Sequence, residues 1–136
     1  GSTSAAIDIS QPGWERILES TVRMHGQFDR VIIADHGYDG MQNWVDDLDF
    51  LDVPEAFRAV DQAIKPGGKL VLAGCNVASD VDGNGSGYLQ KVSKAFGPKK
   101  WITAVGYTGA VYYSTWHHDG VERSSTYGGS VRTTSN

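Results

Sequence analysis

The spacing of apolar residues along the chain predicts helices and strands in alternation. Three stretches carry apolar side chains at intervals of three and four residues, which is typical of amphipathic helices. Three others are short apolar runs rich in β-branched residues, which are typical of buried strands. The expected helices cover residues 14–25, 54–64 and 87–96, and the expected strands cover residues 28–34, 69–73 and 101–105.

The order of these elements predicts an α/β fold. A helix between two strands forms a right-handed crossover, which places the strands parallel to each other in one sheet. A long polar loop is expected over residues 35–52, and weak alternation over residues 106–136 indicates hairpins before a loose tail. We therefore expect residues 1–136 to form one domain, an α/β sandwich with a mainly parallel sheet, a C-terminal hairpin extension and an N-terminal lead-in over residues 1–13.

Composition and charge narrow the classes of function. Of the 136 residues, 40% are hydrophobic and 21% are charged, which is typical of a globular protein rather than a disordered one. The formal net charge of −4 argues against a general nucleic-acid-binding protein. No apolar run approaches the roughly 20 residues that a membrane-spanning helix needs. Cys75 is the only cysteine, which excludes an internal disulfide and a zinc site built from several thiolates.

Two reactive side chains follow the first two expected strands. The first strand ends in Asp35-His36-Gly37, and the second ends in Gly74-Cys75-Asn76. The carboxyl ends of parallel strands meet at one edge of the sheet, where α/β proteins carry their sites. If the two strands are neighbours, about 4.8 Å apart, His36 and Cys75 emerge side by side. An imidazole beside a thiol produces a nucleophile for acyl transfer, and the backbone N–H groups of Gly37 and Cys75 could stabilise an oxyanion.

These motifs resemble those of a peptidase family. The run VIIADHG is followed by LVLAGCNVA, with the cysteine 39 positions after the histidine, and the two together resemble the caspase, gingipain and clostripain group of cysteine peptidases, clan CD. In that group a His-Gly dipeptide follows one strand and an Ala-Cys or Gly-Cys dipeptide follows the next. The chain is most similar to caspase-like domains of large bacterial surface proteins that carry Gly-Cys-Asn-Val-Ala, and more distantly to self-cleaving peptidase domains of bacterial toxins. The resemblance covers residues 28–105.

The resemblance implies a three-layer caspase-like sandwich that hydrolyses peptide bonds without a required cofactor. It implies that His36 is the general base or acid and Cys75 the nucleophile, with the Gly37 and Cys75 amides as the oxyanion hole. The caspase motif Gln-Ala-Cys-x-Gly is not matched by Ala73-Gly74-Cys75-Asn76, so specificity for aspartate is not implied. The implied partner is a protein or peptide substrate, and the physiological substrate and the oligomeric state stay open.

Two alternatives remain beside a peptidase. Some relatives are binding modules, so the same cleft could hold a partner protein without cleaving it. The runs FDRVIIAD and AIKPGGKLVLAG also resemble late motifs of nucleotide-fold methyltransferases. Those enzymes need a glycine-rich turn upstream of the acidic strand, and the residues before Asp29 contain none. The methyltransferase hypothesis is therefore the weaker one.

Other polar and aromatic residues are candidates for substrate contacts. Residues 29–61 contain nine acidic residues against two arginines, which would suit a basic substrate if a site lies there. Candidates for the pocket are two of these acids and two tryptophans, of which Trp44 is expected to be hard to bury in an acidic loop. The four are Asp35, Asp39, Trp44 and Trp116.

One loop resembles half of a calcium site. Asp80, Asp82 and Asn84, followed by Gly85, match the first half of an EF-hand loop, but Lys91 stands where the last ligand should be glutamate. Clusters of Asp, Asn and Gly are more often plain turns. A calcium ion here would order the loop that follows Cys75.

Overall fold

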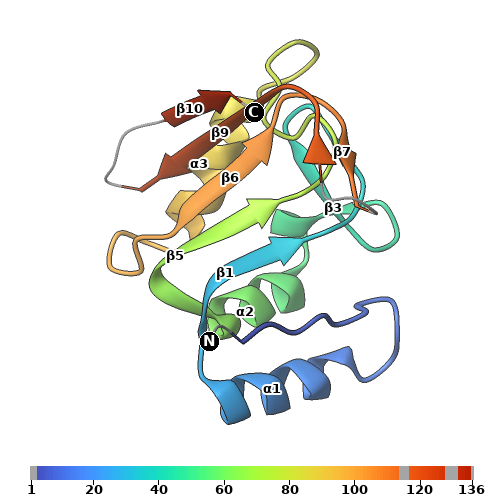
Figure 1. The fold of residues 1–136 in the computed structure, drawn as a ribbon, viewed down its shortest axis with the longest axis vertical. Coiled ribbons are helices and arrows are strands. Elements are labelled where there is room, and N and C mark those ends of the chain that lie inside the picture. Colours follow the sequence, from blue (N-terminus) through green and yellow to red (C-terminus); the bar gives the residue numbers. More distant parts are fainter. Residues whose placement is uncertain (1–2, 114–116, 128–131, 136) are drawn as a thin grey trace.

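The computed structural model describes residues 3–113, 117–127 and 132–135. Its centre is a five-stranded sheet with the order β1-β5-β6-β9-β10 (Figure 1). The strands β1 and β5 are parallel, as are β5 and β6, whereas β9 is antiparallel to both β6 and β10. Four of the five strands therefore run in one direction, which confirms the α/β fold with a mainly parallel sheet. The strands are β1 (Phe28–Ile33), β5 (Ile64–Leu72), β6 (Thr103–Tyr107), β9 (Val121–Thr126) and β10 (Arg132–Ser135).

The three expected helices are present. They are α1 (Trp14–His25), α2 (Pro54–Ala63) and α3 (Gly85–Ala95). Pro54 begins α2, where its missing N–H costs no hydrogen bond. The helix α3 begins two residues earlier than its apolar pattern indicated, because the side chain of Asn84 accepts a hydrogen bond from the N–H of Gly87 (2.9 Å) and caps the helix.

The expected polar loop over residues 35–52 is wrong in part, because much of it forms a small antiparallel sheet. This sheet has the order β2-β3-β4 and is followed by a 3₁₀ turn, η1. The alternation of apolar and polar residues does not reveal these strands, because Gln42 and Asn43 on β3 are both polar and both buried. The elements are β2 (Gly37–Tyr38), β3 (Met41–Trp44), β4 (Leu48–Asp49) and η1 (Phe50–Asp52).

The two faces of the main sheet are covered differently. Leu70 and Leu72 of one face share a core with the buried residues of α2 and α3, so both helices lie on that face. Val71 and Val105 point to the other face and belong to a separate cluster with Val111. Val111 lies on β7 (Val111–Tyr112), which pairs with β8 (His117–His118). The expected C-terminal hairpin is thus confirmed, and among the described residues this hairpin, rather than a helix, packs on the second face.

A row of aromatic rings links the small sheet to the helices. The rings of Trp14, Trp44, Phe50 and Phe57 follow one another at centroid distances of 5.6, 6.1 and 6.3 Å. Phe57 in turn contacts Phe96 at 4.6 Å. Such tilted and edge-on pairs add to the free energy gained from burying the rings. Phe50 is completely buried at the centre of this row.

None of the helices within the described ranges is both long and apolar enough to cross a membrane.

We expect Phe50→Ala to lower the free energy of unfolding by about 3–5 kcal/mol, since it removes a fully buried ring that its neighbours cannot replace. Urea denaturation followed by tryptophan fluorescence measures the change. Leu48→Ala is the matched control, because Leu48 lies two residues away and is 50% exposed, so its loss should cost about 0.5 kcal/mol or less. Equal losses in the two variants would contradict the central place of Phe50 in the core.

Candidate functional site

The two sequence motifs lie next to each other at the carboxyl ends of β1 and β5. Ile33 is in register with Leu72, and the N–H of Ala73 continues the ladder by donating to the carbonyl oxygen of Ile33 (2.9 Å). In Figure 1 the arrowheads of both strands point to the same edge of the sheet. The segments 35–37 and 74–76 therefore leave neighbouring strands at the same level, as the sequence predicts.

The backbones of Gly37 and Gly74 touch each other. A Cβ atom on Gly74 would lie 2.6 Å from the Cα of Gly37 and 2.8 Å from its nitrogen. A Cβ on Gly37 would lie 2.7 Å from the Cα and the carbonyl carbon of Gly74. No side chain fits between them, so both positions require glycine for close approach rather than for an unusual backbone angle. This contact places the residue after His36 against the residue before Cys75.

A buried glutamine joins the same two segments. Gln42 on β3 has no exposed surface. Its Oε1 accepts a hydrogen bond from the N–H of Gly74 (2.8 Å), while its Nε2 donates to the carbonyl oxygens of Asn43 (3.0 Å) and His36 (3.4 Å). Sequence reasoning missed Gln42. The only available signal was a glutamine between Met41 and Trp44, in a stretch that looked like a polar loop.

His36 has a fixed backbone and an exposed side chain. Its N–H donates to Oδ1 of Asp35 (2.7 Å), and its carbonyl oxygen accepts from the N–H of Asn43 (2.9 Å). The imidazole makes no hydrogen bond to any residue that the structure describes, Cys75 included. The ring therefore remains available to a thiol or a substrate after rotation of the side chain, as catalytic groups in unliganded proteins often are.

Cys75 is partly buried, and its sulfur contacts the backbone of β7. The N–H of Val111 donates to Sγ (3.5 Å), and the thiol lies 3.9 Å from the carbonyl oxygen of the same residue. A backbone hydrogen bond adjoins this contact: the N–H of Asn76, the residue after Cys75, donates to the carbonyl of Gly109, two residues before Val111 (2.9 Å). The thiol is thus held between the end of β5 and the hairpin that covers the second face.

Both expected oxyanion donors are free of partners within the described part of the chain. The N–H of Cys75 donates to no acceptor there. Where β2 pairs with β3, the N–H of Asn43 donates to the carbonyl of His36, so these two residues form a hydrogen-bonded pair. The next pair, Gly37 with Gln42, is therefore one without hydrogen bonds between the strands. The N–H of Gly37 therefore points away from β3, and its nitrogen lies beside Gly74.

Tyr113 closes the gap between the two strand ends. Its hydroxyl is within hydrogen-bonding distance of the carbonyl oxygens of Asp35 and Ala73 (2.6 Å to Ala73). Burial raises the pKa of Tyr113 to about 12, and the nearby negative charges of the Cys75 thiolate and Asp35 act in the same direction. This contact could not be predicted, since nothing in the sequence pattern of residues 106–136 connects Tyr113 to the strand ends.

Two of the residues expected to line a substrate pocket, Asp35 and Asp39, bond to loops on either side of the strand ends. Both carboxylate oxygens of Asp35 accept backbone hydrogen bonds, from His36 and from Val45 (3.0 Å), so Asp35 stabilises the loop. Oδ2 of Asp39 accepts from the hydroxyl of Ser79 (2.8 Å) and the N–H of Asp82 (2.7 Å). Asp39 therefore ties the β2–β3 turn to the loop that follows Cys75.

The expectation that Trp44 is hard to bury is wrong. Trp44 is only 8% exposed, because the aromatic row described above surrounds it, and the surface that it keeps lines a hollow beside α1. Trp116, the other tryptophan proposed for the pocket, lies outside the described residues.

The proposed calcium ligands have other partners. Both oxygens of Asp80 are bonded, Oδ1 to the N–H of Ser86 (2.9 Å) and Oδ2 to the Ser86 hydroxyl (2.7 Å) and the Arg123 guanidinium (2.9 Å). The Ser86 backbone N–H and hydroxyl, and then Arg123, lower the pKa of Asp80. Asn84 caps α3, and the Asp82 side chain is exposed. Calcium binding stays a prediction, one in which a cation would compete with Arg123.

Among residues 3–113, 117–127 and 132–135, no three or more His, Cys, Asp or Glu side chains are grouped so that they could hold a metal ion.

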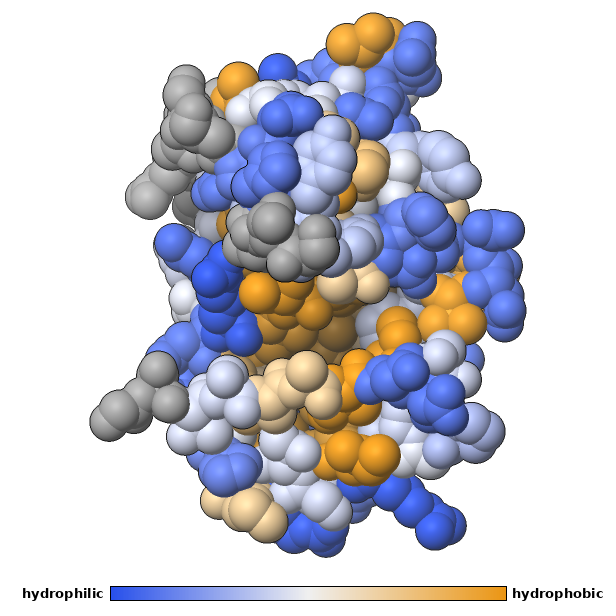
Figure 2. All heavy atoms as spheres, turned by 45° about the vertical axis from the view of Figure 1, so that its right-hand side comes forward, coloured by the Kyte–Doolittle hydropathy of each residue, from blue (hydrophilic) through white to orange (hydrophobic). Residues whose placement is uncertain are grey.

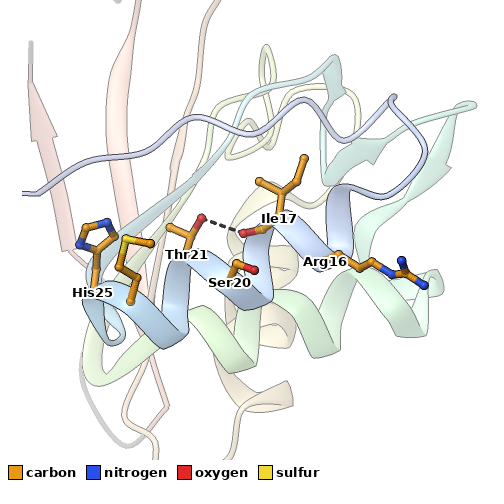
Figure 3. A pocket seen from close by; sticks show the side chains of 6 residues that line it. Arg16, Ile17, Ser20, Thr21 and His25 are labelled. Carbon is orange, nitrogen blue, oxygen red and sulfur yellow. Dashed lines mark hydrogen bonds between the residues drawn. The ribbon is translucent and has the colours of Figure 1, made fainter.

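Two surface hollows lie away from the strand ends. One, of about 320 Å³, is lined by six residues of α1 alone, and Figure 3 shows their side chains spread along one helix rather than converging on a point. The other, of about 450 Å³, lies between α1, the β3–β4 turn and α2, and includes Glu15, Asp46 and Arg58. Neither includes His36 or Cys75. Figure 2 shows a hollow with a hydrophobic floor on the side brought forward from Figure 1.

We expect Gly74→Ala to separate the two segments, because its Cβ would overlap the backbone of Gly37. The free energy of unfolding should fall by about 2 kcal/mol or more, a typical cost of overpacking. Thermal and urea unfolding measure the loss. Gly106→Ala on β6 is the control, since its nearest neighbour is the Ala78 side chain at 3.3 Å, and it should cost about 1 kcal/mol or less. A Gly74→Ala protein as stable as the wild type would show that the contact is not required.

We also expect the stability of the protein to fall between pH 10 and pH 12 because of Tyr113. Its pKa is raised on folding, so its contribution is fully present below about pH 10 and is lost as the pH rises through about 12. Two pKa units correspond to about 2.7 kcal/mol, and solvent screening of a ring that is 44% exposed reduces this to about 1 kcal/mol.

Urea unfolding at pH 9, 10 and 11 tests this expectation. Tyr113→Phe should lose less stability over this range than the wild type, because the other tyrosines titrate in both proteins. If the free energy of unfolding falls equally with pH in the two proteins, Tyr113 is not the group responsible.

Comparisons of this chain with protein-family models, with curated proteins and with solved structures found no match.

Proposed function

We propose that this protein is a caspase-like cysteine endopeptidase that acts through His36 and Cys75. The observation that supports it best is the direct contact between Gly37 and Gly74, which brings the residues after β1 and after β5 together at one edge of the sheet. A histidine and the only cysteine flank this contact, and both have neighbouring backbone N–H groups with no partner in the described part of the chain.

The proposed reaction is an acyl transfer in two steps. The His36 imidazole takes the thiol proton of Cys75, and the thiolate attacks the carbonyl carbon of a peptide bond. The N–H groups of Gly37 and Cys75 donate to the oxyanion that forms. When the tetrahedral intermediate collapses, the C–N bond breaks and the imidazolium protonates the leaving amine, which leaves a thioester. Water, deprotonated by the same imidazole, then releases the carboxylic acid and restores the thiol.

The substrate of this reaction is a peptide or protein, which includes another segment of the same chain. Both oxygens of Asp35 bind backbone N–H groups, so the loop holds its carboxylate in one place. Its place beside His36 suits a structural role, since a carboxylate bonded to the N–H of His36 keeps the histidine backbone in one orientation. The peptide library described below identifies the residue before the cleaved bond.

A binding module of the same fold is the second candidate function. It is favoured by one observation: the Cys75 sulfur is hydrogen-bonded to Val111 and not to His36. A thiol that serves only to pack β7 against the sheet would look like this. The two candidates differ in a measurable property, the dependence of thiol reactivity on the histidine.

We expect the wild-type protein to cleave members of a positional-scanning fluorogenic peptide library, and Cys75→Ala and His36→Ala to cleave none. Each protein is assayed with excess calcium and with a chelator, which also tests the predicted calcium dependence. Circular dichroism spectra confirm that all variants are folded. An absence of cleavage by the wild-type protein, with all variants folded, would reject the peptidase and favour the binding module.

Alkylation by iodoacetamide provides the second measurement. In the peptidase, His36→Ala slows alkylation of Cys75 near neutral pH about tenfold or more, because the imidazole no longer promotes the thiolate. In the binding module the two rates agree. His25→Ala is the matched control, since His25 ends α1 before β1 begins, whereas His36 follows the other end of that strand.

A further inference from the structure

Gln42 is buried between the two segments that carry the candidate catalytic residues. It has no exposed surface, and its amide forms three hydrogen bonds to backbone atoms. Two of these atoms directly adjoin the site: the N–H of Gly74, the residue before Cys75, and the carbonyl oxygen of His36. The Tyr113 hydroxyl also joins the two strand ends, but it contacts the carbonyl oxygens of Asp35 and Ala73 rather than the Gly74 N–H and the His36 carbonyl.

The bond to His36 determines the direction of an oxyanion donor. The carbonyl of His36 and the N–H of Gly37 belong to one peptide unit, which is planar and trans, so the two groups point in opposite directions. Nε2 of Gln42 and the N–H of Asn43 both hold this carbonyl on the side of β3. The N–H of Gly37 is thereby directed away from β3, toward the side on which Gly74 lies.

The bond to Gly74 holds the other half of the site. Oε1 of Gln42 receives the Gly74 N–H at 2.8 Å, at the point where the chain leaves the main sheet. Because one rigid amide forms both bonds, it sets the position of the His36-Gly37 peptide relative to the residue that precedes the nucleophile. An amide offers an acceptor and a donor together without carrying a charge.

We propose that Gln42 is a positioning residue, which holds the Gly37 N–H and the Cys75 segment in the relative position that oxyanion stabilisation requires. This inference rests on the proposed peptidase function. It predicts that Gln42 matters when negative charge forms on a substrate oxygen, and matters little for other reactions of the thiol.

Gln42→Met tests the proposal, because methionine has a similar length and volume but forms neither hydrogen bond. We expect kcat for the best library peptide to fall about tenfold or more, less than the roughly 100-fold or more that deleting an oxyanion donor costs, because the Asn43 N–H still holds the His36 carbonyl, and we expect KM to change less than threefold. We expect alkylation of Cys75 by iodoacetamide to change less than threefold, since this displacement forms no oxyanion. The difference between the two rates is the result that a purely structural role would not produce.

Gln42→Glu provides a second variant that keeps the shape of the side chain. A protonated carboxyl accepts from Gly74 and still donates one hydrogen bond, whereas an ionised carboxylate has no proton to donate and repels the carbonyl oxygens. The ratio of its kcat to that of the wild-type protein should therefore rise as the pH falls, while the ratio for Gln42→Met stays level. Ser93→Ala is the control, because Ser93 is equally buried but bonds within α3, and its kcat should match that of the wild type.

Three results would overturn the proposal. One is a folded Gln42→Met protein whose kcat lies within threefold of the wild-type value. The second is a fall of kcat and alkylation rate by the same factor in both Gln42 variants at every pH, which would assign Gln42 to stability alone. The third is a wild-type protein without turnover, which rejects the peptidase itself and this inference with it, and is distinguished from the first two by the wild-type assay.

Discussion

The contact between Gly37 and Gly74 is the constraint on which the rest of the site depends. Parallel pairing of β1 and β5 brings the strand ends to one edge, but pairing alone leaves the following residues free to diverge. The two glycines prevent this, because their backbones lie closer than any side chain would permit. Every other feature of the site, from the glutamine amide to the tyrosine hydroxyl, acts on segments whose separation this contact has already set.

The small sheet β2-β3-β4 supports that contact from the side of the helices. Gln42 bonds to the segments on either side of it, while Trp44, two residues farther along β3, anchors the same strand in the aromatic row. Asp35, which precedes β2, accepts a hydrogen bond from the N–H of Val45, which follows β3, and so joins the two ends of the β2–β3 hairpin. The residues after Trp44 adopt the left-handed conformation at Val45, Asp46 and Asp47, which costs free energy in a residue with a side chain. The burial of Trp44 and Phe50 on either side of this turn offsets that cost.

The parts of this fold that could be predicted from sequence are those that a regular pattern controls. The runs around Ile33 and Leu72 are continuous and apolar; Leu70, Val71 and Leu72 of β5 are buried on both faces of the sheet, although Ile32 on β1 is 42% exposed. The positions of His36 and Cys75 after those strands followed directly. Residues 35–52 could not be predicted in this way, since Gln42 and Asn43 are polar and yet buried. Their hydrogen bonds go to backbone atoms distant in the sequence, and no local pattern reveals a partner such as Gly74.

Tyr113 and the thiol contacts escaped prediction for a related reason. They depend on how the β7–β8 hairpin folds back over the second face of the sheet, which brings residues about 36 positions apart together at Cys75. The Val111 N–H that meets the sulfur is a backbone group, so the identity of the side chain carries no information about it. Sequence reasoning could identify which residues are chemically able to react, but not which backbone groups surround them.

The site thus combines a backbone that is held at many points with two reactive side chains that are held at few. The peptide units around Gly37 and Gly74 are bonded to Gln42, Asn43 and Ile33 through neighbouring residues, whereas the His36 ring is exposed and bonds to no described residue. Rotation about the His36 side chain crosses only low barriers between staggered positions, and it leaves the backbone unchanged. The choice between a peptidase and a binding module is therefore not a choice between folds. It depends on whether the His36 imidazole can replace the Val111 N–H as the partner of the Cys75 sulfur. The backbone around the two residues is compatible with either function.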